Sequence, residues 1–233
     1  IPYPVPSAST RWIGQDTGEG QDNRMNISDF VDVLDDGMPH FDFIMFDACF
    51  MMSVEVAYEV RNYTDYYIGS PTENPGPGAP YDKVVPYMFK PGAAAQMAEA
   101  YFNHYKDNYK AGEGISNANW TGGTSICAVR TDALDDLADV TGQLLERADN
   151  ESVPSFNTVF DYDKRDMEEG HVGYYDFSQM MEMRLDADAY VAWKNVFDAS
   201  IVYWNTTDKN YSMFKRMFSM EGTNGITHYI PLS

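Results

Sequence analysis

The sequence has few cysteines, few basic residues and no long hydrophobic run. Only 2 cysteines occur in 233 residues, which is too few for a framework of disulfide bonds. Lys and Arg number 16 against 36 Asp and Glu, so the formal net charge of -20 argues against nucleic acid as a partner. No stretch approaches the ~20 apolar residues that cross a bilayer, and we expect no membrane span in this chain.

Hydrophobic residues make up 44% of the chain, which is enough for one substantial core, and we expect a single domain over residues 1–233. Periodicity predicts helices at 26–34, 50–63, 93–109 and 177–199 and one beginning at Thr131; it predicts strands at 41–46, 66–69, 124–130 and 226–230. This alternation predicts an α/β fold, an α/β/α sandwich around a mostly parallel central sheet. The Pro- and Gly-rich stretch 70–86 predicts a loop on the carboxyl side of a strand, where such folds bind ligands.

The most informative stretch is FDFIMFDACFMMSVE, residues 41–55, in which an apolar run ends in an acid, an alanine and a cysteine. A run this apolar predicts a strand buried on both faces. If a helix begins at Phe50, Cys49 lies at its N-terminus, which favours the thiolate. Lowering a thiol pKa from ~8.5 to about 6 requires roughly 3.4 kcal/mol, whereas a helix dipole supplies at most ~2. We therefore expect a cationic partner for Cys49, with histidine the best candidate.

The run FDACFMMSVEVAYEVRNYTDYYIGSPTE resembles the nucleophile segment of the clostripain-like cysteine peptidases, family C11, clan CD relatives of the caspases. The resemblance continues less specifically through DYDK and YYDF to ITHYIPLS. It implies a caspase-like fold and a bacterial endopeptidase, secreted, periplasmic or on the cell surface, that cuts after Arg or Lys with a Cys-His dyad. Cys49 is then the nucleophile, and its own backbone N–H contributes to the oxyanion hole.

The resemblance assigns the base of the pocket for the P1 side chain to Asp47. Asp47 precedes Cys49 by two residues, so strand alternation sends both side chains to one side of the sheet. Thr72 and Glu73, on the loop after the next strand, are the expected wall of this S1 pocket. The alternative for Asp47 is a cap on the following helix. Some relatives carry a second acid where this chain has residues 75–78, PGPG, so the preference between Arg and Lys stays open.

The catalytic histidine of this family lies in a His-Gly pair before the cysteine, and this sequence has no such pair. Only His40 precedes Cys49, and it stands at the opposite end of the predicted strand. The other histidines, His104, His171 and His228, are expected to be structural or solvated. We therefore expect this chain to be the C-terminal, heavy-chain portion of a protein that cleaves itself, with the histidine on an associated N-terminal light chain. A truncated sequence would also lack the His-Gly pair, and so would a true pseudoenzyme.

Acidic clusters at 16–22, 35–36 and 161–169 raise the question of calcium, which some relatives need. None matches the spacing of an EF-hand loop, so we expect no metal and no cofactor. The second cysteine, Cys127, lies in an apolar strand-like run and is expected to be a buried structural thiol. Two alternatives remain: a catalytically inactive caspase-like module that binds basic peptides through Asp47, and a thiol redox protein, which the lack of a Cys-x-x-Cys pair disfavours.

Overall fold

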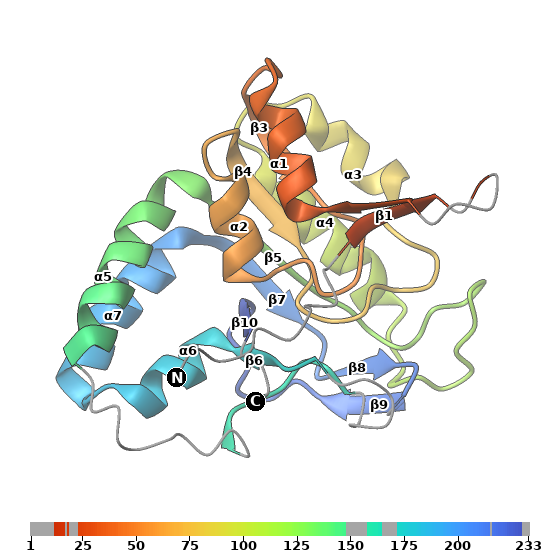
Figure 1. Ribbon diagram of the computed structural model, residues 1–233. Coiled ribbons are helices and arrows are strands. Elements are labelled where there is room, and N and C mark those ends of the chain that lie inside the picture. Colours follow the sequence, from red (N-terminus) through yellow and green to blue (C-terminus); the bar gives the residue numbers. More distant parts are fainter. Residues whose placement is uncertain are drawn as a thin grey trace.

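The computed structural model describes residues 12–16, 18, 23–147, 158–164, 172–214 and 216–229. Helices cover both faces of a four-stranded sheet, so the predicted α/β sandwich is confirmed (Figure 1). The strands follow the order β3-β4-β5-β7, with the bounds Phe41–Met45, Thr64–Gly69, Ser125–Arg130 and Ile201–Thr206.

The described sheet is mixed, whereas we expected mostly parallel strands. β3 and β4 are parallel, but β4 pairs with β5, and β5 with β7, in antiparallel fashion. The reason lies in the connection between β4 and β5, which contains two helices packed on each other, α3 (Tyr81–Met88) and α4 (Ala94–Asp107). This helix pair returns the chain to the end of the sheet where β4 finished. Cys127, near the start of β5, therefore lies opposite Gly69 at the end of β4.

Alternate residues of β5 face two separate cores, as the period of a strand requires. Ile126 and Ala128 pack with α3 and α4, and Cys127 and Val129 pack against the opposite layer of helices. That layer consists of α1 (Ile27–Asp35), α2 (Val54–Val60), α5 (Leu134–Arg147), α6 (Phe177–Arg184) and α7 (Ala187–Ser200). Cys127 is 0% exposed, so the prediction of a buried thiol is confirmed.

Three antiparallel strand pairs surround this sandwich. They are β1 (Trp12–Asp16) with β2 (Asn23–Asn26), β6 (Tyr174–Asp176) with β10 (Thr227–Tyr229), and β8 (Lys209–Ser212) with β9 (Arg216–Ser219). The N–H of Thr227 donates to the carbonyl of Met52 at 3.0 Å, which attaches β10 to the segment after β3. A short 3₁₀ turn, Thr131–Ala133, leads into α5.

The prediction was wrong at α3 and at 177–199. The sequence did not reveal α3, which begins inside the stretch predicted as loop and extends beyond it, because Pro80 at its N-cap and Pro86 inside it resemble helix breakers. The region 177–199 is two helices, since the backbone is extended at Leu185 and Asp186, and Asp186 caps the second helix by accepting the N–H of Ala189 at 2.9 Å. No helix in the described ranges has both the length and the hydrophobicity needed to cross a bilayer.

Candidate active site

Asp47 and Cys49 lie just beyond the carboxyl end of β3, and Cys49 is exposed. The segments after β3 and β4 stay hydrogen-bonded to each other, now in the antiparallel sense, since Phe50 N–H donates to the Thr72 carbonyl at 2.9 Å and Met52 N–H donates to the Ser70 carbonyl at 3.0 Å. The two segments that follow β3 and β4 therefore run side by side, which brings the nucleophile candidate next to the loop after β4.

The predicted helix N-terminus does not face Cys49, and that expectation was wrong. Phe50 has a φ of 58°, in the left-handed region, and its N–H is used by the neighbouring segment. The positive φ is incompatible with the right-handed backbone of an α-helix, and the hydrogen bond ties Phe50 to the neighbouring segment. The helix begins at Val54 instead, with Ser53 as its N-cap. Four residues thus separate Cys49 from α2, and the helix dipole gives the sulfur little support.

The described surroundings of the sulfur raise the pKa of Cys49. Although Cys49 is exposed as a residue, the protein atoms around its sulfur remove part of its hydration, and this desolvation is the largest cause that raises the pKa of Cys49; the charges of Glu73 and Asp47 raise it further. The N–H of Asn74, which donates to Sγ at 3.2 Å, and the N–H of Cys49 itself lower the pKa but do not outweigh these causes. The thiol therefore needs a cation or a base that these groups do not supply.

Each histidine that the structure describes has other partners. The ring of His40 lies 2.8 Å from Asp65 Oδ1 at the start of the sheet, away from the end that carries Cys49. The ring of His104 packs on Tyr105, and His228 Nδ1 lies 2.8 Å from Glu55 Oε1. These contacts are the structural or solvated roles that we expected. The fourth histidine, at position 171, lies outside the described residues.

Asp47 is held by the loop after β4. Its Oδ1 accepts from Asn74 Nδ2 at 3.1 Å, and its Oδ2 accepts from the N–H of Ala79 at 2.8 Å and from the hydroxyl of Tyr81 at 3.3 Å. Asp47 does not cap the following helix, because Ser53 has that role. The carboxylate is therefore oriented by three donors at the edge of the sheet that carries the exposed sulfur.

Thr72 and Glu73 make contacts that hold the loop in place. Thr72 is 0% exposed, and its Oγ1 lies 2.7 Å from Ser125 Oγ on β5. The carboxylate of Glu73 accepts from Ser212 Oγ at 2.8 Å and from the N–H of Met213 at 3.0 Å. In this structure their side chains brace the loop against β5 and β8.

Sequence reasoning missed Asn74 and Tyr81, the two residues whose side chains reach Asp47. The available signal was weak. Asn74 is a polar residue before a proline in a loop at the carboxyl end of a strand, which is a common place for functional side chains. Tyr81 begins a helix that the prolines concealed.

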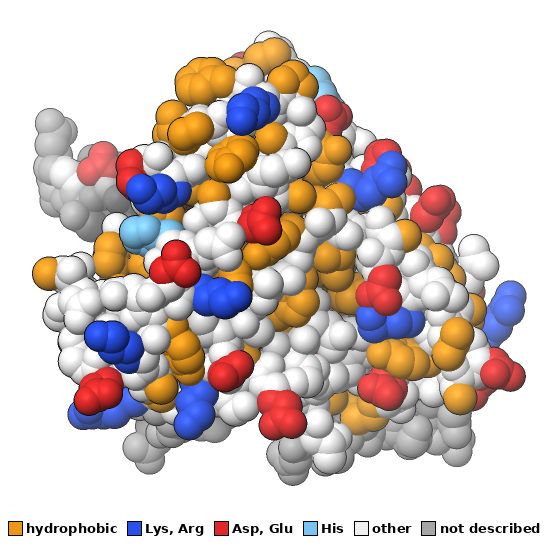
Figure 2. Space-filling view, turned by 180° about the vertical axis from the view of Figure 1, so that it is seen from behind, with side chains coloured by type: hydrophobic (Ala, Val, Ile, Leu, Met, Phe, Trp, Pro, Cys, Tyr) orange, Lys and Arg blue, Asp and Glu red, His pale blue; other side chains and the backbone are white. Residues whose placement is uncertain are grey.

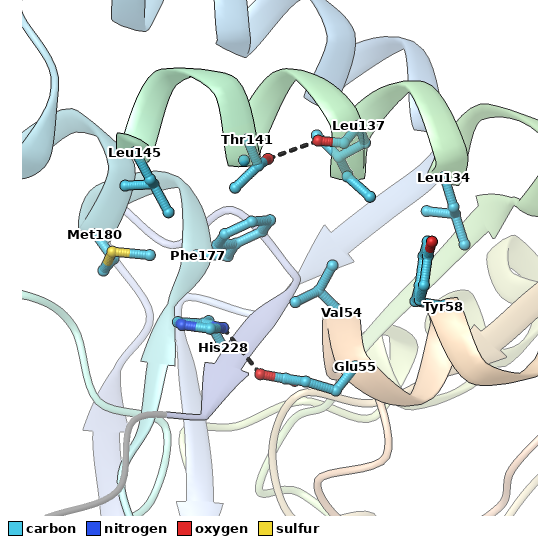
Figure 3. A pocket seen from close by; sticks show the side chains of 12 residues that line it. Val54, Glu55, Tyr58, Leu134, Leu137, Thr141, Leu145, Phe177, Met180 and His228 are labelled. Carbon is cyan, nitrogen blue, oxygen red and sulfur yellow. Dashed lines mark hydrogen bonds and ion pairs between the residues drawn. The ribbon is translucent and has the colours of Figure 1, made fainter. Parts of the chain in front are cut away.

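A separate apolar groove of about 350 Å³ lies between α2, α5, α6 and β10 (Figure 3). Its walls are mainly aliphatic and aromatic, and the pair Glu55–His228 lies on one side of it. Neither Asp47 nor Cys49 lines this groove. Among the residues that the structure describes, no three His, Cys, Asp or Glu side chains gather as ligands for a metal ion.

Comparison with known proteins places this site in a family. The sequence profile of the clostripain family matches residues 3–231. A B. fragilis cysteine protease of known structure is 39% identical, with a TM-score of 0.85 over 95% of this chain and 89% of that one. A search of curated proteins gives no match.

Two further solved structures are longer proteins. A secreted C11 cysteine protease from Bacteroides thetaiotaomicron, in complex with an irreversible peptide inhibitor, is 42% identical with a TM-score of 0.83, over 97% of this chain but only 62% of that one. An inactive zymogen C11 protease from Parabacteroides distasonis is 27% identical with a TM-score of 0.75, over 89% and 57% of the two chains. The chain thus spans less than two thirds of either protein. It belongs to the clostripain family of cysteine peptidases.

Proposed function

We propose that this chain is the nucleophile-bearing, heavy-chain portion of an endopeptidase that cuts peptide bonds after Arg or Lys. The observation that carries the proposal is the pairing of an exposed cysteine with an oriented carboxylate, Cys49 and Asp47, at the carboxyl end of one strand. A carboxylate there can pair with the cationic tip of a P1 side chain, and the cysteine can attack the adjacent carbonyl.

The proposed reaction begins with transfer of the Cys49 proton to an imidazole. The thiolate forms an S–C bond to the P1 carbonyl carbon while the carbonyl electrons move to oxygen, where the Cys49 N–H stabilises them. In the described part of the chain no other residue accepts that N–H. Collapse of the intermediate breaks the C–N bond, and the imidazolium protonates the leaving amine. Water then hydrolyses the acyl-enzyme by the reverse sequence, and no cofactor enters the reaction.

The imidazole is proposed to come from an associated N-terminal light chain. The raised pKa of Cys49 calls for a base or cation, and the described histidines have other partners. In this scheme autoproteolysis between the histidine and the cysteine releases the heavy chain's first residues and activates the enzyme. Without that partner, the chain is expected to be inactive.

The outer edge of β3, which no other strand of the described residues pairs with, supports this partnership. β3 has the apolar sequence FDFIM of a strand covered on both sides, yet it is the last strand of the described sheet and its apolar residues are only partly buried. At the same end of the molecule, Tyr81 and Val85 on α3 are 53% and 38% exposed, and Phe89, just after this helix, is 84% exposed. Apolar side chains also reach the surface there in the view from behind (Figure 2). A strand of the light chain would cover this edge.

We place the protein outside the cytoplasm. The 42% identical relative is a secreted protease, and a net charge of -20 suits a solvated surface. Fractionation of cells that express the complete protein tests this assignment, and recovery in the cytoplasm alone contradicts it.

A second candidate is a catalytically inactive caspase-like module that binds basic peptides through Asp47. The observation in its favour is that the pKa of Cys49 is raised, which is unfavourable for a nucleophile. The two candidates differ in one respect, since only the peptidase forms a covalent bond with a substrate analogue.

The test is to treat the complete protein with a peptide acyloxymethyl ketone that bears Arg or Lys at P1 and to measure adduct mass on Cys49. We expect labelling of wild type and of the control Asp42→Asn, a matched change on the same strand. We expect Asp47→Asn to be labelled about 100-fold more slowly, since it loses a charged contact. Binding of basic peptides without an adduct supports the inactive module. Unchanged labelling of Asp47→Asn removes the pocket assignment.

A further inference from the structure

One residue, Asn74, contacts both the nucleophile candidate and the proposed specificity acid. Its backbone N–H donates to Cys49 Sγ at 3.2 Å, and its side-chain Nδ2 donates to Asp47 Oδ1 at 3.1 Å. One bond leaves from the backbone and the other from the tip of a short side chain on the same residue, so a shift of one displaces the other. Pro75 follows and restricts the backbone of Asn74 to extended conformations, which limits the ways in which this bridge can relax.

We propose that Asn74 is a positioning residue that couples the P1 pocket to the nucleophile, because its amide anchors on Asp47 and thereby aims its N–H at the sulfur. The inference rests on the proposed function, since it takes Asp47 as the P1 acid. The other carboxylate oxygen of Asp47 accepts from the N–H of Ala79 and the hydroxyl of Tyr81, but Asp47 is exposed, so a bound cation can still restrain the carboxylate further. A carboxylate offers about four acceptor positions, and three protein donors leave one for a P1 cation.

The coupling has a kinetic consequence. A P1 cation bound at Asp47 fixes the carboxylate, which fixes the amide of Asn74 and the N–H that faces Cys49. That N–H stabilises the thiolate more than the thiol, because hydrogen bonds to a charged acceptor are the stronger ones. A basic P1 residue therefore raises kcat as well as lowering KM. A pocket that acts only by binding changes KM with kcat unaltered.

The experiment uses the complete protein and compares peptides that carry Lys or norleucine at P1. Asn74→Leu removes the amide with little change in volume, Asn74→Gln restores an amide, and Asn103→Leu is the matched control on the exposed face of α4. Steady-state kcat and KM are measured across the pH range of activity. A thermal melt confirms that each variant is folded, and Asn74→Ser replaces Asn74→Leu where the latter does not fold.

We expect Asn74→Leu to lower kcat for the Lys peptide about 100-fold, as misplacement of a group by about 1 Å can do. We also expect the acid limb of its pH profile to move to higher pH, because the thiolate loses a donor. Asn74→Gln should recover part of both effects, and Asn103→Leu should match wild type. If Asn74→Leu has the same kcat and the same acid limb as wild type, the coupling is overturned and the proposed function is not. Equal turnover of both peptides by wild type overturns the proposed function, and with it the coupling.

Discussion

Gly78 packs directly against Asp47, since a Cβ atom at position 78 would lie 3.1 Å from Asp47 Oδ2. Gly78 also has a φ of +79°, in the left-handed region that side chains disfavour. The loop after β4 can therefore approach the carboxylate closely only with glycine at this position. A side chain at position 78 would therefore have two effects: it would strain the backbone, and it would displace the carboxylate of Asp47.

Gly78→Ala should destabilise the fold by about 1–2 kcal/mol and also weaken cleavage after basic residues. The control is Gly37→Ala, because Gly37 has a φ of +85° and nothing within 4 Å of an added Cβ. Urea unfolding should report a similar loss for both variants. Only Gly78→Ala should raise KM for a Lys peptide. An unchanged KM in Gly78→Ala contradicts the contact with Asp47.

The chain by itself should react slowly with alkylating agents. The pKa of Cys49 is raised by desolvation and by the charges of Glu73 and Asp47, so the reactive thiolate appears only above the ordinary titration range of a thiol. Iodoacetamide labelling against pH, read by mass spectrometry, should show this late onset. Addition of the proposed light chain should move the onset to lower pH. Cys127, whose pKa is raised by complete burial, should stay unlabelled in the native state and provides an internal control. Fast labelling of Cys49 at neutral pH in the chain alone contradicts the prediction.

The contact between Glu55 and His228 should make stability depend on pH. Burial by itself raises the pKa of Glu55, but His228 and the N–H of Tyr229 outweigh burial and lower it. The folded state thus holds fewer protons on Glu55 than the unfolded state does. Its contribution is complete above the ordinary glutamate pKa of about 4.3 and is lost as pH falls through the lowered folded value.

Glu55→Gln should therefore lower the free energy of unfolding by about 0.5–1 kcal/mol at neutral pH, a small amount because the pair is partly exposed. At a pH below the lowered pKa of Glu55 the substitution should have no effect. Denaturant unfolding at several pH values measures the difference from wild type. Glu59→Gln, on the exposed side of the same helix, provides the matched control. A difference that persists unchanged to low pH excludes the carboxylate of Glu55 as its source.

Long segments with one clear period could be predicted from the sequence. The strand predicted at 41–46 is Phe41–Met45, and the helix predicted at 93–109 is Ala94–Asp107. An apolar run that ends in an acid, an alanine and a cysteine also located Asp47 and Cys49 correctly at the end of a strand. These features depend on residues that are close in the chain, where propensity and burial agree.

The features that could not be predicted from the sequence depend on contacts between residues that are far apart in the chain. The start of α2 is delayed because Phe50 and Met52 bond to the segment after β4, which no local pattern reveals. The contact of Asn74 with Asp47 joins residues 27 positions apart, and that of Glu73 with Ser212 joins residues 139 positions apart. Such contacts depend on the path of loops, and tertiary contacts override local propensity at these positions.

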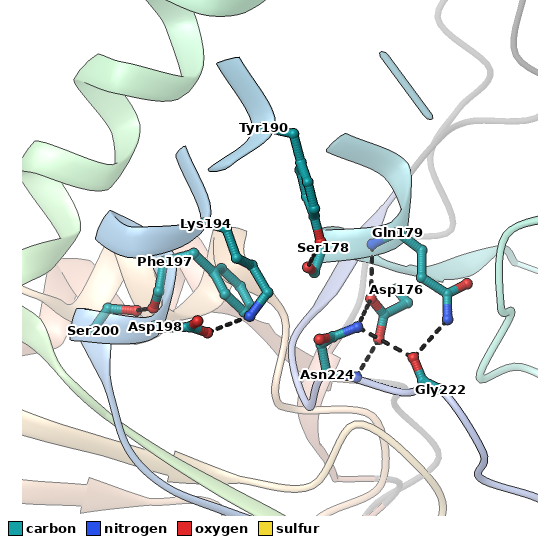
Figure 4. A network of polar contacts seen from close by, with 10 residues as sticks. All are labelled: Asp176, Ser178, Gln179, Tyr190, Lys194, Phe197, Asp198, Ser200, Gly222 and Asn224. Atoms are coloured by element: carbon teal, nitrogen blue, oxygen red, sulfur yellow. Dashed lines mark hydrogen bonds and ion pairs between the residues drawn. The ribbon is translucent and has the colours of Figure 1, made fainter. Parts of the chain in front are cut away.

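Asp176 should be among the most important residues for stability, although it lies outside the proposed reaction. Its buried carboxylate accepts from the N–H of Gln179 at 3.0 Å and from the N–H and side chain of Asn224 at 2.6 and 3.0 Å (Figure 4). It also accepts from the hydroxyl of Tyr162 at 2.7 Å. One residue thus caps α6 and joins two loops. Burial nevertheless raises its pKa, because these donors only partly replace the lost hydration.

Asp176→Ala should lower the free energy of unfolding by about 3–5 kcal/mol, because buried donors lose their acceptor together. Asp198→Ala is the control in the same view, since Asp198 pairs with Lys194 on the surface of α7 and should cost only about 0.3–0.5 kcal/mol. Urea unfolding of both variants measures the contrast. A loss for Asp176→Ala no larger than that for Asp198→Ala would mean that water replaces the carboxylate, and that the junction of α6 with its loops is held by apolar packing instead.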